Sequence, residues 1–213
     1  MIAKLMQLLR WPRFDSSANY WEKRYRTGGN SGPGSYAHLA EFKAEVLNKF
    51  VRKHEVLSVI EFGCGDGNQL TLAQYPDYFG YDVSARAIEI CRSKFSNDPR
   101  KQFGLVSIYD NRLADLSLSL DVIFHLVEDA VFHDYMLRLF AASNRFVGIY
   151  SSNTEDSNQS QAPHVKHRMF SNWIAENASG WSLLEHVPNR FPDNGNNRTT
   201  SFSEFFFYER AHE

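Results

Sequence analysis

The feature that most constrains the fold of this chain is an alternation of short apolar segments with segments of helical periodicity. Residues 36–54 carry apolar side chains at helical spacing, and residues 56–62 form a short apolar segment that ends at Gly63. Strands that alternate with helices pair in parallel through crossover connections. We therefore predict an α/β fold built on a doubly wound, mostly parallel sheet.

Five strands and four helices are expected from this alternation. The strand candidates are residues 56–62, 78–83, 103–108, 114–119 and 145–151. The helix candidates are residues 36–54, residues 67–74, a segment after Ser84 that carries Ala87, Ile88, Cys91 and Phe95, and residues 128–142. Ser84 is a good N-cap because its hydroxyl can accept a hydrogen bond from a backbone amide of the first helical turn.

The C-terminal part of the chain lacks this alternation. Residues 181–187 and 201–208 are strand candidates with no helix between them, and a long loop rich in Asn, Gly and Pro joins them at 188–200. Two such strands are typical of an antiparallel hairpin. We expect this hairpin to close one edge of a seven-stranded sheet. A loop of this length is more often functional or mobile than idle.

Residues 1–35 are expected to form a helical cover with a glycine-rich loop, ahead of a single domain at residues 36–213. Ile2, Leu5, Met6 and Leu9 form one helical stripe, which packs on the domain itself or contacts a partner or a membrane surface. The glycine-rich run at 28–34 does not suit regular structure, and we predict a mobile loop there.

Charge and cysteine content exclude several classes of protein. The 23 Lys and Arg residues against 25 Asp and Glu residues give a net charge of −2, without the basic excess of a general nucleic-acid binder. Cys64 and Cys91 form neither a metal-ligand spacing nor a disulfide framework. No window approaches ~20 apolar residues, and the N-terminus lacks the features of a signal peptide. We expect a cytoplasmic protein without a metal or a nucleic-acid partner; its oligomeric state stays open.

A glycine-rich turn follows the first predicted strand. Residues 61–67 read EFGCGDG, and glycines at such a turn let the backbone bend tightly and let a ligand approach the main chain. Asp82 stands 21 residues after Glu61, at the end of the second predicted strand. A carboxylate at that position can accept hydrogen bonds from the hydroxyls of a ribose.

The spacing of the glycines distinguishes between two classes of cofactor. A dinucleotide fingerprint is G-x-G-x-x-G, whereas this turn is G-x-G-x-G with Glu61 before it and Asp66 within it. Two carboxylates around the turn repel a pyrophosphate and suit a cationic ligand with an amino group. S-adenosylmethionine, which carries a sulfonium and an ammonium, fits this pattern. A nicotinamide-dependent oxidoreductase on the same fold is one alternative, and a non-catalytic binding or scaffold protein is another.

These segments resemble class I S-adenosylmethionine-dependent methyltransferases. Residues 61–67 are similar to the first motif of that family, residues 80–84 (GYDVS) to its second, and residues 115–126 (DLSLSLDVIFHL) to its fourth-strand motif. The family has a Glu where this chain has Phe124. The resemblance covers roughly residues 56–152 and implies a small, Rossmann-like, bacterial type of methyltransferase with S-adenosyl-L-methionine as its cofactor.

The resemblance also implies roles for individual residues. Glu61, Gly63 and Gly65 line the methionine end of the cofactor, Asp82 holds the ribose, and residues 119–121 lie beneath the sulfonium. Asp110 is the expected partner of the adenine amino group. The full set of cofactor-binding candidates is Tyr25, Glu61, Phe62, Gly63, Cys64, Gly65, Asp82, Val83, Ser107, Tyr109, Asp110, Ser119, Leu120 and Asp121.

The N-terminal aromatic segment, residues 20–25, resembles the cover that many small methyltransferases fold over the cofactor. Its aromatic rings stack on adenine or shield the sulfonium, with the glycine run as the hinge. Packing of the same rings on the rim of the sheet is the alternative.

Three histidines, His125, His164 and His167, are candidates for a base at the methyl acceptor, because imidazole titrates near neutral pH. Polar and aromatic residues of the loops are candidates for binding the acceptor, for which we expect a small soluble molecule such as a sugar or glycan precursor, methylated on oxygen or nitrogen. These candidates are Tyr36, Lys166, Arg168, Asn189 and Arg190.

Overall fold

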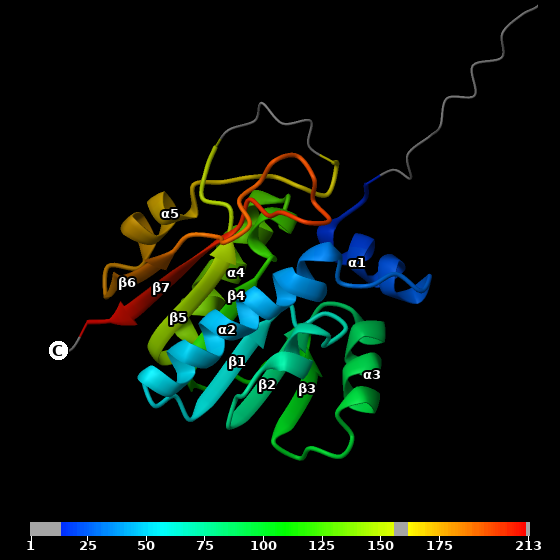
Figure 1. Ribbon diagram of the computed structural model, residues 1–213, viewed down its shortest axis with the longest axis horizontal. Coiled ribbons are helices and arrows are strands. Elements are labelled where there is room, and N and C mark those ends of the chain that lie inside the picture. The colour runs from blue at the N-terminus through cyan, green and yellow to red at the C-terminus, as the bar shows by residue number, and fades with distance from the viewer. Residues whose placement is uncertain (1–13, 156–161, 212–213) are drawn as a thin grey trace, which may run out of the picture.

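The computed structural model describes residues 14–155 and 162–211, and the chain folds around one seven-stranded sheet (Figure 1). The strands are β1 (Ser58–Phe62), β2 (Asp77–Asp82), β3 (Lys101–Leu105), β4 (Ala114–Leu120), β5 (Ser143–Ser151), β6 (Trp181–Val187) and β7 (Glu204–Arg210). Their order in the sheet is β3-β2-β1-β4-β5-β7-β6. Strands β1 to β5 pair in parallel, and β7 runs antiparallel to both β5 and β6. The predicted doubly wound sheet with a C-terminal hairpin is confirmed.

Helices cover both faces of this sheet (Figure 1). The α-helices are α1 (Ser17–Arg26), α2 (Ala37–Lys53), α3 (Ala85–Lys94), α4 (Asp129–Ala141) and α5 (Phe170–Asn177), and the short 3₁₀ segments are η1 (Pro33–Ser35), η2 (Gln69–Leu72), η3 (Val106–Ile108) and η4 (Ile123–His125). Helices α2 and α3 cover one face, and α4 and α5 cover the other. Helix α1 lies beyond the carboxyl ends of the parallel strands (Figure 1).

Alternate residues of the central strands pack in two separate apolar cores, one on each face of the sheet. Val59 packs in the core under α2, and its neighbour Ile60 packs in the core under α4, because successive side chains of a strand point to opposite faces. Phe50 of α2 stacks on Phe207 of β7 at 4.0 Å between ring centroids. The central strands of the sheet are therefore buried on both faces.

Two predicted elements differ from the structure. The helix predicted at 67–74 is wrong: this segment contains only η2, because Gly67 has a positive φ of 68° and the Asn68 amide donates to Asp66 Oδ1, which makes a local turn instead of a helical one. The strand predicted at 103–108 ends at Leu105 and continues as η3. Helix α5 was not predicted, since its eight residues follow a polar loop and bury only Phe170 and Ile174.

The boundaries of the hairpin also shift. Strand β7 begins at Glu204, and Ser201 instead forms an isolated bridge with Pro192 inside the connecting loop. The apolar stripe from Ile2 to Leu9 lies outside the described residues. Within the described part of the chain, no helix is both long and apolar enough to cross a membrane.

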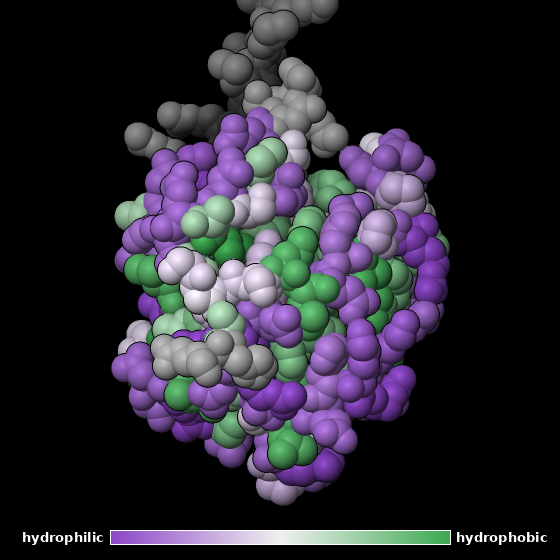
Figure 2. Space-filling view, turned by 90° about the vertical axis from the view of Figure 1, so that its left-hand side faces the viewer, coloured by the Kyte–Doolittle hydropathy of each residue, from purple (hydrophilic) through white to green (hydrophobic). Residues whose placement is uncertain are grey.

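Strand β6 is an edge of the sheet on the side of the molecule drawn in Figure 2. Apolar and polar patches alternate over that side. Leu183 is 54% exposed on β6, but Ser182 and His186 on the same strand are exposed and polar. Polar side chains of this kind discourage further strand addition at an edge.

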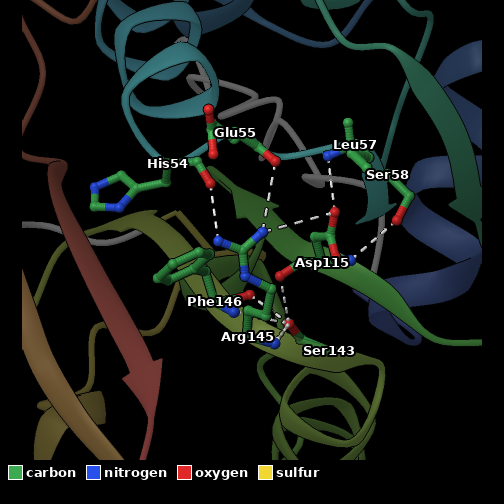
Figure 3. Close-up of polar contacts among 8 residues, drawn as sticks. All are labelled: His54, Glu55, Leu57, Ser58, Asp115, Ser143, Arg145 and Phe146. Carbon is green, nitrogen blue, oxygen red and sulfur yellow. Dashed lines mark hydrogen bonds and ion pairs between the residues drawn. The ribbon is translucent and has the colours of Figure 1, made fainter.

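Arg145 of β5 links several segments at the amino-terminal end of the sheet (Figure 3). Its guanidinium donates to the carbonyl of His54 at 2.9 Å, lies 3.9 Å from Asp115 and packs 4.8 Å from the ring centroid of Phe146. Asp115 also accepts the amide of Leu57 at 2.7 Å. These contacts tie the end of α2 to β4 and β5 at the end opposite the cavity described below.

The imidazole of His54 lies beside these contacts, and its substitution tests the packing there. It packs on Phe50 and Phe146, at 4.3 and 5.0 Å between centroids, and its Nε2 is buried with no hydrogen-bond partner among the described residues. Burial, followed by the charge of Lys53, lowers the pKa of His54. The folded state therefore favours the neutral ring.

We predict that His54→Phe stabilises the protein, and more so at acid pH. A histidine whose pKa is lower in the folded state contributes fully to the free energy of unfolding above its unfolded-state pKa of about 6.5. That contribution is lost as pH falls through the folded-state pKa. Removing an unsatisfied buried nitrogen should add about 1 kcal/mol to the free energy of unfolding. Urea melts near pH 5.5 and pH 8 measure the gain. His186→Gln, which keeps a polar side chain at an exposed site, is the control. A gain for His54→Phe that is larger at pH 8 would contradict the account.

Candidate active site and its cover

A cavity of about 330 Å³ opens at the carboxyl ends of β1, β2 and β4, beneath α1. Small-molecule sites typically occupy ~300–1,000 Å³. In a doubly wound sheet the ligand crevice lies at this edge, where the strand order reverses; here that point is between β1 and β4.

The glycine turn after β1 forms the floor of the cavity. Gly63 and Gly65 have positive φ angles of 89° and 57°. A Cβ on Gly63 would lie 2.4 Å from a methyl of Val122, and one on Gly65 would lie 2.3 Å from Ser31 Oγ. Both the backbone conformation and the close approach therefore require glycine.

Asp82, at the end of β2, fastens this turn to α3. Its Oδ2 accepts the amide of Gly65 at 2.9 Å, and its Oδ1 accepts the amide of Ser84 at 2.8 Å. Ser84 in turn caps α3 by accepting the amide of Ala87, as its sequence position predicts. Burial raises the pKa of Asp82 to about 6, although the backbone donors oppose the shift. A carboxylate has about four lone-pair sites, so Asp82 can still accept ligand hydroxyls.

Glu61, on β1, is 5% exposed and accepts one hydrogen bond, from the hydroxyl of Tyr78 at 2.7 Å. Burial raises the pKa of Glu61 to about 7, while the Tyr78 hydroxyl and the charge of Lys43 act in the opposite direction. This carboxyl group therefore changes charge near neutral pH.

Lys43 is a lining residue that the sequence analysis missed. Its ammonium, on a side chain that is 1% exposed, pairs with Asp121 Oδ2 at 2.8 Å, and Asp121 Oδ1 accepts the hydroxyl of Ser203 at 2.8 Å. The ammonium also lies 5.2 Å from the ring centroid of Tyr150. One signal was available in the sequence: Lys43 stands inside the apolar stripe of its helix, beside Phe42.

The glycine-rich loop covers the cavity and is fastened by Asp66. Asp66 Oδ2 accepts the amide of Ser31 at 3.0 Å and the hydroxyl of Tyr36 at 2.7 Å, and the Asp66 amide donates back to Ser31 Oγ at 3.0 Å. Ser31 Oγ also contacts the hydroxyl of Tyr25 at 3.0 Å. Burial opposes ionisation of Asp66, but the hydrogen bonds from Tyr36 and Ser31 prevail and lower its pKa.

Helix α1 is fastened over the cavity at two points. Near its start, the amide and hydroxyl of Ser17 donate to the carboxylate of Glu128. At its middle, Glu22 accepts the hydroxyl of Ser84 at 2.7 Å, beside the N-terminus of α3, where a carboxylate is favoured by the helix dipole. Trp21, between these points, lines the cavity.

His125, at the end of η4, is the one candidate base whose side chain lines the cavity. Its Nδ1 lies 2.9 Å from the carbonyl of His164, so the ring donates there and Nε2 is the acceptor of the neutral tautomer. Burial lowers the pKa of His125 to about 4. Trp21 packs edge-on against this ring at 4.9 Å between centroids.

The other two histidines lie outside the cavity lining. The ring of His164 stacks on Tyr20 at 4.2 Å and on His125 at 5.4 Å. His167 contacts the hydroxyl of Ser152 at 2.6 Å instead. His164 thus contributes its backbone carbonyl, which contacts His125, whereas His167 does not line the cavity.

Most of the predicted acceptor-binding residues are held in other contacts. Lys166 and Arg168 pair with Asp129, at 2.5 and 2.8 Å. The buried amide of Asn189 donates to the hydroxyl of Tyr150 and to the carbonyl of Ser203, and Arg190 pairs with Glu45 on the surface. Tyr36 holds Asp66, as described above.

The predicted adenine segment also differs from the cavity lining. Ser107 and Asp110 are exposed, with Asp110 paired to Arg112, and Tyr109 donates to the carbonyl of Arg112. Ser119 is fully buried and contacts the hydroxyl of Tyr135. Val106, just before Ser107, does line the cavity.

The predicted residues that line the cavity are Tyr25, Glu61, Phe62, Gly63, Cys64, Gly65, Asp82, Val83, Leu120, Asp121 and His125. Trp21 of the predicted aromatic cover and Asp66 of the glycine turn also line it, and lining residues that the sequence analysis did not assign include Lys43, Gln69, Tyr81, Asp134 and Arg138. Asp134 and Arg138 come from α4, at one end of the cavity.

Comparison with solved structures identifies the fold. The N-methyltransferase NodS from Bradyrhizobium japonicum, in complex with S-adenosyl-L-homocysteine, matches with a TM-score of 0.67 at 14% identity, over 93% of this chain and 100% of that chain. Magnesium protoporphyrin IX methyltransferase from Synechocystis, also with S-adenosyl-L-homocysteine, matches with a TM-score of 0.61 at 14% identity, over 93% and 96%. The methyltransferase domain of bacterial CtHen1 matches with a TM-score of 0.62 at 17% identity, over 81% and 98%.

No protein-family model and no curated protein sequence matches the chain. The structural matches show that the chain has the fold of class I S-adenosylmethionine-dependent methyltransferases, as its motifs predicted.

The contact between the glycine turn and the cover yields a prediction for Gly65→Ala. The new methyl would meet Ser31 Oγ at 2.3 Å and the hydroxyl of Tyr25 at 2.8 Å, and alanine at a positive φ costs about 1 kcal/mol. We expect the cover to detach, so that trypsin cleaves after Arg26 faster than in the wild type. Gly180→Ala, with nothing within 4 Å of its Cβ, is the control. Equal cleavage of the two variants would show that Ser31 does not depend on Gly65.

Proposed function

We propose that this chain is an S-adenosylmethionine-dependent methyltransferase that transfers a methyl group to an oxygen or nitrogen of a small acceptor. The observation that carries the proposal is the composition of one cavity. The glycine turn, the carboxyl groups of Glu61 and Asp82, and the imidazole of His125 all line it.

The cavity lining suits a cationic cofactor. Five acidic side chains face two basic ones, Lys43 and Arg138, across the lining. Gln69 Oε1 is buried there with no hydrogen-bond partner among the described residues, while its amide nitrogen donates to the carbonyl of Ala40. A buried acceptor without a donor is costly, and an ammonium group of a ligand would satisfy it. The acids of the lining are Glu61, Asp66, Asp82, Asp121 and Asp134.

These residues divide along the proposed cofactor. Glu61 and Gln69 would hold the ammonium of the methionine moiety, and Asp82 would hold the ribose hydroxyls. Val106, Asp134 and Arg138 replace the segment 107–110 as candidates for the adenine end. Two of the matched structures contain S-adenosyl-L-homocysteine, which supports the choice of cofactor.

His125 would orient the acceptor. When bound, S-adenosylmethionine supplies a methyl group on a sulfonium, which a nucleophile attacks in line, so that positioning supplies much of the rate. His125 is neutral at pH 7, with Nε2 as its acceptor atom. It would accept the O–H or N–H of the nucleophile and take its proton once methylation has made that proton strongly acidic.

The class of acceptor rests on the surroundings of His125. Trp21 and Tyr25 line the cavity with aromatic rings, which stack on planar or sugar rings. A sugar or glycan precursor is therefore the first acceptor to test, followed by aromatic amines and phenols. The matched proteins are named for chemically different reactions, an N-methyltransferase and a magnesium protoporphyrin methyltransferase.

Cofactor binding should release protons, and this tests the role of Glu61. The ammonium of the ligand, which S-adenosyl-L-homocysteine shares with S-adenosylmethionine, favours the ionised carboxylate. Binding therefore lowers the pKa of Glu61 from about 7, and affinity rises as pH increases through neutrality. Isothermal titration with S-adenosyl-L-homocysteine in buffers of different ionisation enthalpy measures the protons released. NAD is the parallel control; binding of NAD alone would favour an oxidoreductase.

Glu61→Gln should remove most of that proton release and weaken binding by about 10-fold or more, the value of a charge-assisted hydrogen bond. Glu45→Gln, an exposed carboxylate on α2, is the matched control and should leave both quantities unchanged. Proton release that persists in Glu61→Gln would assign it to another acid of the cavity, with Asp82 as the first candidate.

His125→Asn tests the acceptor step. Asparagine keeps a donor near the position of Nδ1, toward the carbonyl of His164, but removes Nε2. On an acceptor identified with methyl-labelled S-adenosylmethionine, turnover should fall by about 100-fold or more, while affinity for S-adenosyl-L-homocysteine stays within about threefold. His167→Asn is the matched control, since that ring lies outside the cavity lining. Full activity of His125→Asn would rule out this role.

A further inference from the structure

The two cysteines of the chain meet directly beneath the glycine turn. Cys64 stands between Gly63 and Gly65, and Cys91 lies on α3 with its thiol donating to the carbonyl of Gly65 at 3.2 Å. The thiol of Cys64 is in hydrogen-bond contact with the thiol of Cys91. Residues 27 positions apart in the sequence are thus brought side by side under the proposed cofactor.

Neighbouring glycines make the space for this pair. A Cβ on Gly80 would lie 3.0 Å from Cys64 Sγ, and one on Gly67 would lie 2.9 Å from Cys91 Sγ. Any larger residue at either position would collide with a thiol. The two sulfur atoms are therefore confined between β2 and the turn, and they have little room to move apart.

The two thiols differ in access. Cys91 is fully buried in the core, whereas Cys64 is 7% exposed and lines the cavity. Both cysteines belong to the core under α2 and α3, and Cys64 is the member of the pair that an oxidant entering the cavity meets. A ligand bound in the cavity would cover that route.

We propose that Cys64 and Cys91 form a reversible disulfide that prevents cofactor binding, and that bound cofactor protects the pair from oxidation. The inference rests on the proposed function for its consequence, but the disulfide itself can be observed without any activity. It adds a modification site to the floor of the cavity.

The chemistry balances with a peroxide as the oxidant. The sulfur of Cys64, as the thiolate, attacks one peroxide oxygen; the O–O bond breaks, hydroxide leaves and takes up the thiol proton as water, and Cys64 becomes a sulfenic acid. The sulfur of Cys91 then attacks Cys64 Sγ, an S–S bond forms, and the S–O bond breaks with loss of a second water. Two thiols are oxidised, and one peroxide is reduced to two waters.

Closure of the bond would change the cofactor floor. Disulfide sulfurs lie about 2.05 Å apart, closer than two hydrogen-bonded thiols, so the turn must move toward α3. Cys91 would also lose the proton that it donates to the carbonyl of Gly65. Since the turn is held by Asp82 and covered by Ser31, a shift of Gly65 alters both contacts at once. The contact with the Cys91 thiol, followed by burial, raises the pKa of Cys64, so the reaction should be slow at neutral pH and faster as pH rises.

The test uses the full-length reduced protein, treated with hydrogen peroxide with and without saturating S-adenosyl-L-homocysteine. We expect a mass lower by two hydrogens, a 64–91 cross-link in non-reducing peptide maps, and slower formation with ligand present. Affinity for S-adenosyl-L-homocysteine should fall by at least about 10-fold in the oxidised protein, the size of a modest loss of contacts. Dithiothreitol should restore it.

Cys91→Ala is the matched variant, because Cys91 is not a lining residue; it cannot form the cross-link, and a loss of affinity as large as that of the wild type after the same treatment would assign the effect to oxidation of Cys64 alone and overturn the proposal. Cys91→Ser serves if the alanine variant does not fold. Absence of the cross-link in folded protein, or a cross-link that leaves affinity unchanged, would overturn the proposal. If the reduced protein fails to bind S-adenosyl-L-homocysteine, the proposed function fails with it, whereas binding before and after oxidation overturns the disulfide proposal alone.

Discussion

Buried carboxyl groups at the carboxyl end of the sheet are the constraint around which the rest of this molecule is arranged. An ionised carboxylate out of water is strongly disfavoured unless hydrogen bonds or a counter-ion compensate. Asp82 receives two backbone amides, Asp121 receives Lys43 and Ser203, and Glu61 receives one tyrosine hydroxyl. The least compensated acid, Glu61, is the one whose pKa reaches about 7. These pairings fasten α2, the loop before β7 and the turn after β1 to the carboxyl end of the sheet.

The same pairings join the cavity to its cover. Asp66 belongs to the glycine turn but bonds to Ser31 and Tyr36 of the covering segment. Gly34 of that segment approaches Asp121 so closely that a Cβ would lie 2.9 Å from its carboxylate. A ligand that alters the charge around the turn therefore also alters what holds the cover. Opening for exchange of a ligand requires these hydrogen bonds to break as a group, since they share Asp66 and Ser31.

Much of the fold was predictable because its signals are local. Short apolar segments alternating with helical ones predicted the five parallel strands, and the glycine-rich motif at 61–67 predicted the floor of the cavity. The predicted helix at 67–74 failed because the Asp66 side chain and the backbone of Gly67 favour a turn, which a count of apolar spacing does not register. Asn189 and Arg190 were assigned to the acceptor from residue type alone, yet one satisfies buried groups and the other pairs with Glu45. Lys43 and Arg138 reach the cavity from helices; the position of Lys43 inside an apolar stripe indicated that it turns inward, but only tertiary packing shows that both side chains line the cavity.

Burial shifts the pKa values of two groups that line this cavity in opposite directions. It raises the pKa of Glu61 to about 7 and lowers that of His125 to about 4, because a low dielectric favours the neutral form of either group. Near neutral pH the imidazole is uncharged and Glu61 is close to half ionised. Whether Glu61 is ionised then depends on the charge of the ligand that binds beside it. A cationic ligand would convert Glu61 to its ionised form, and the neutral His125 would remain free to accept a proton from the second substrate. One physical effect thus favours the neutral form of both groups, the carboxyl of Glu61 and the imidazole of His125.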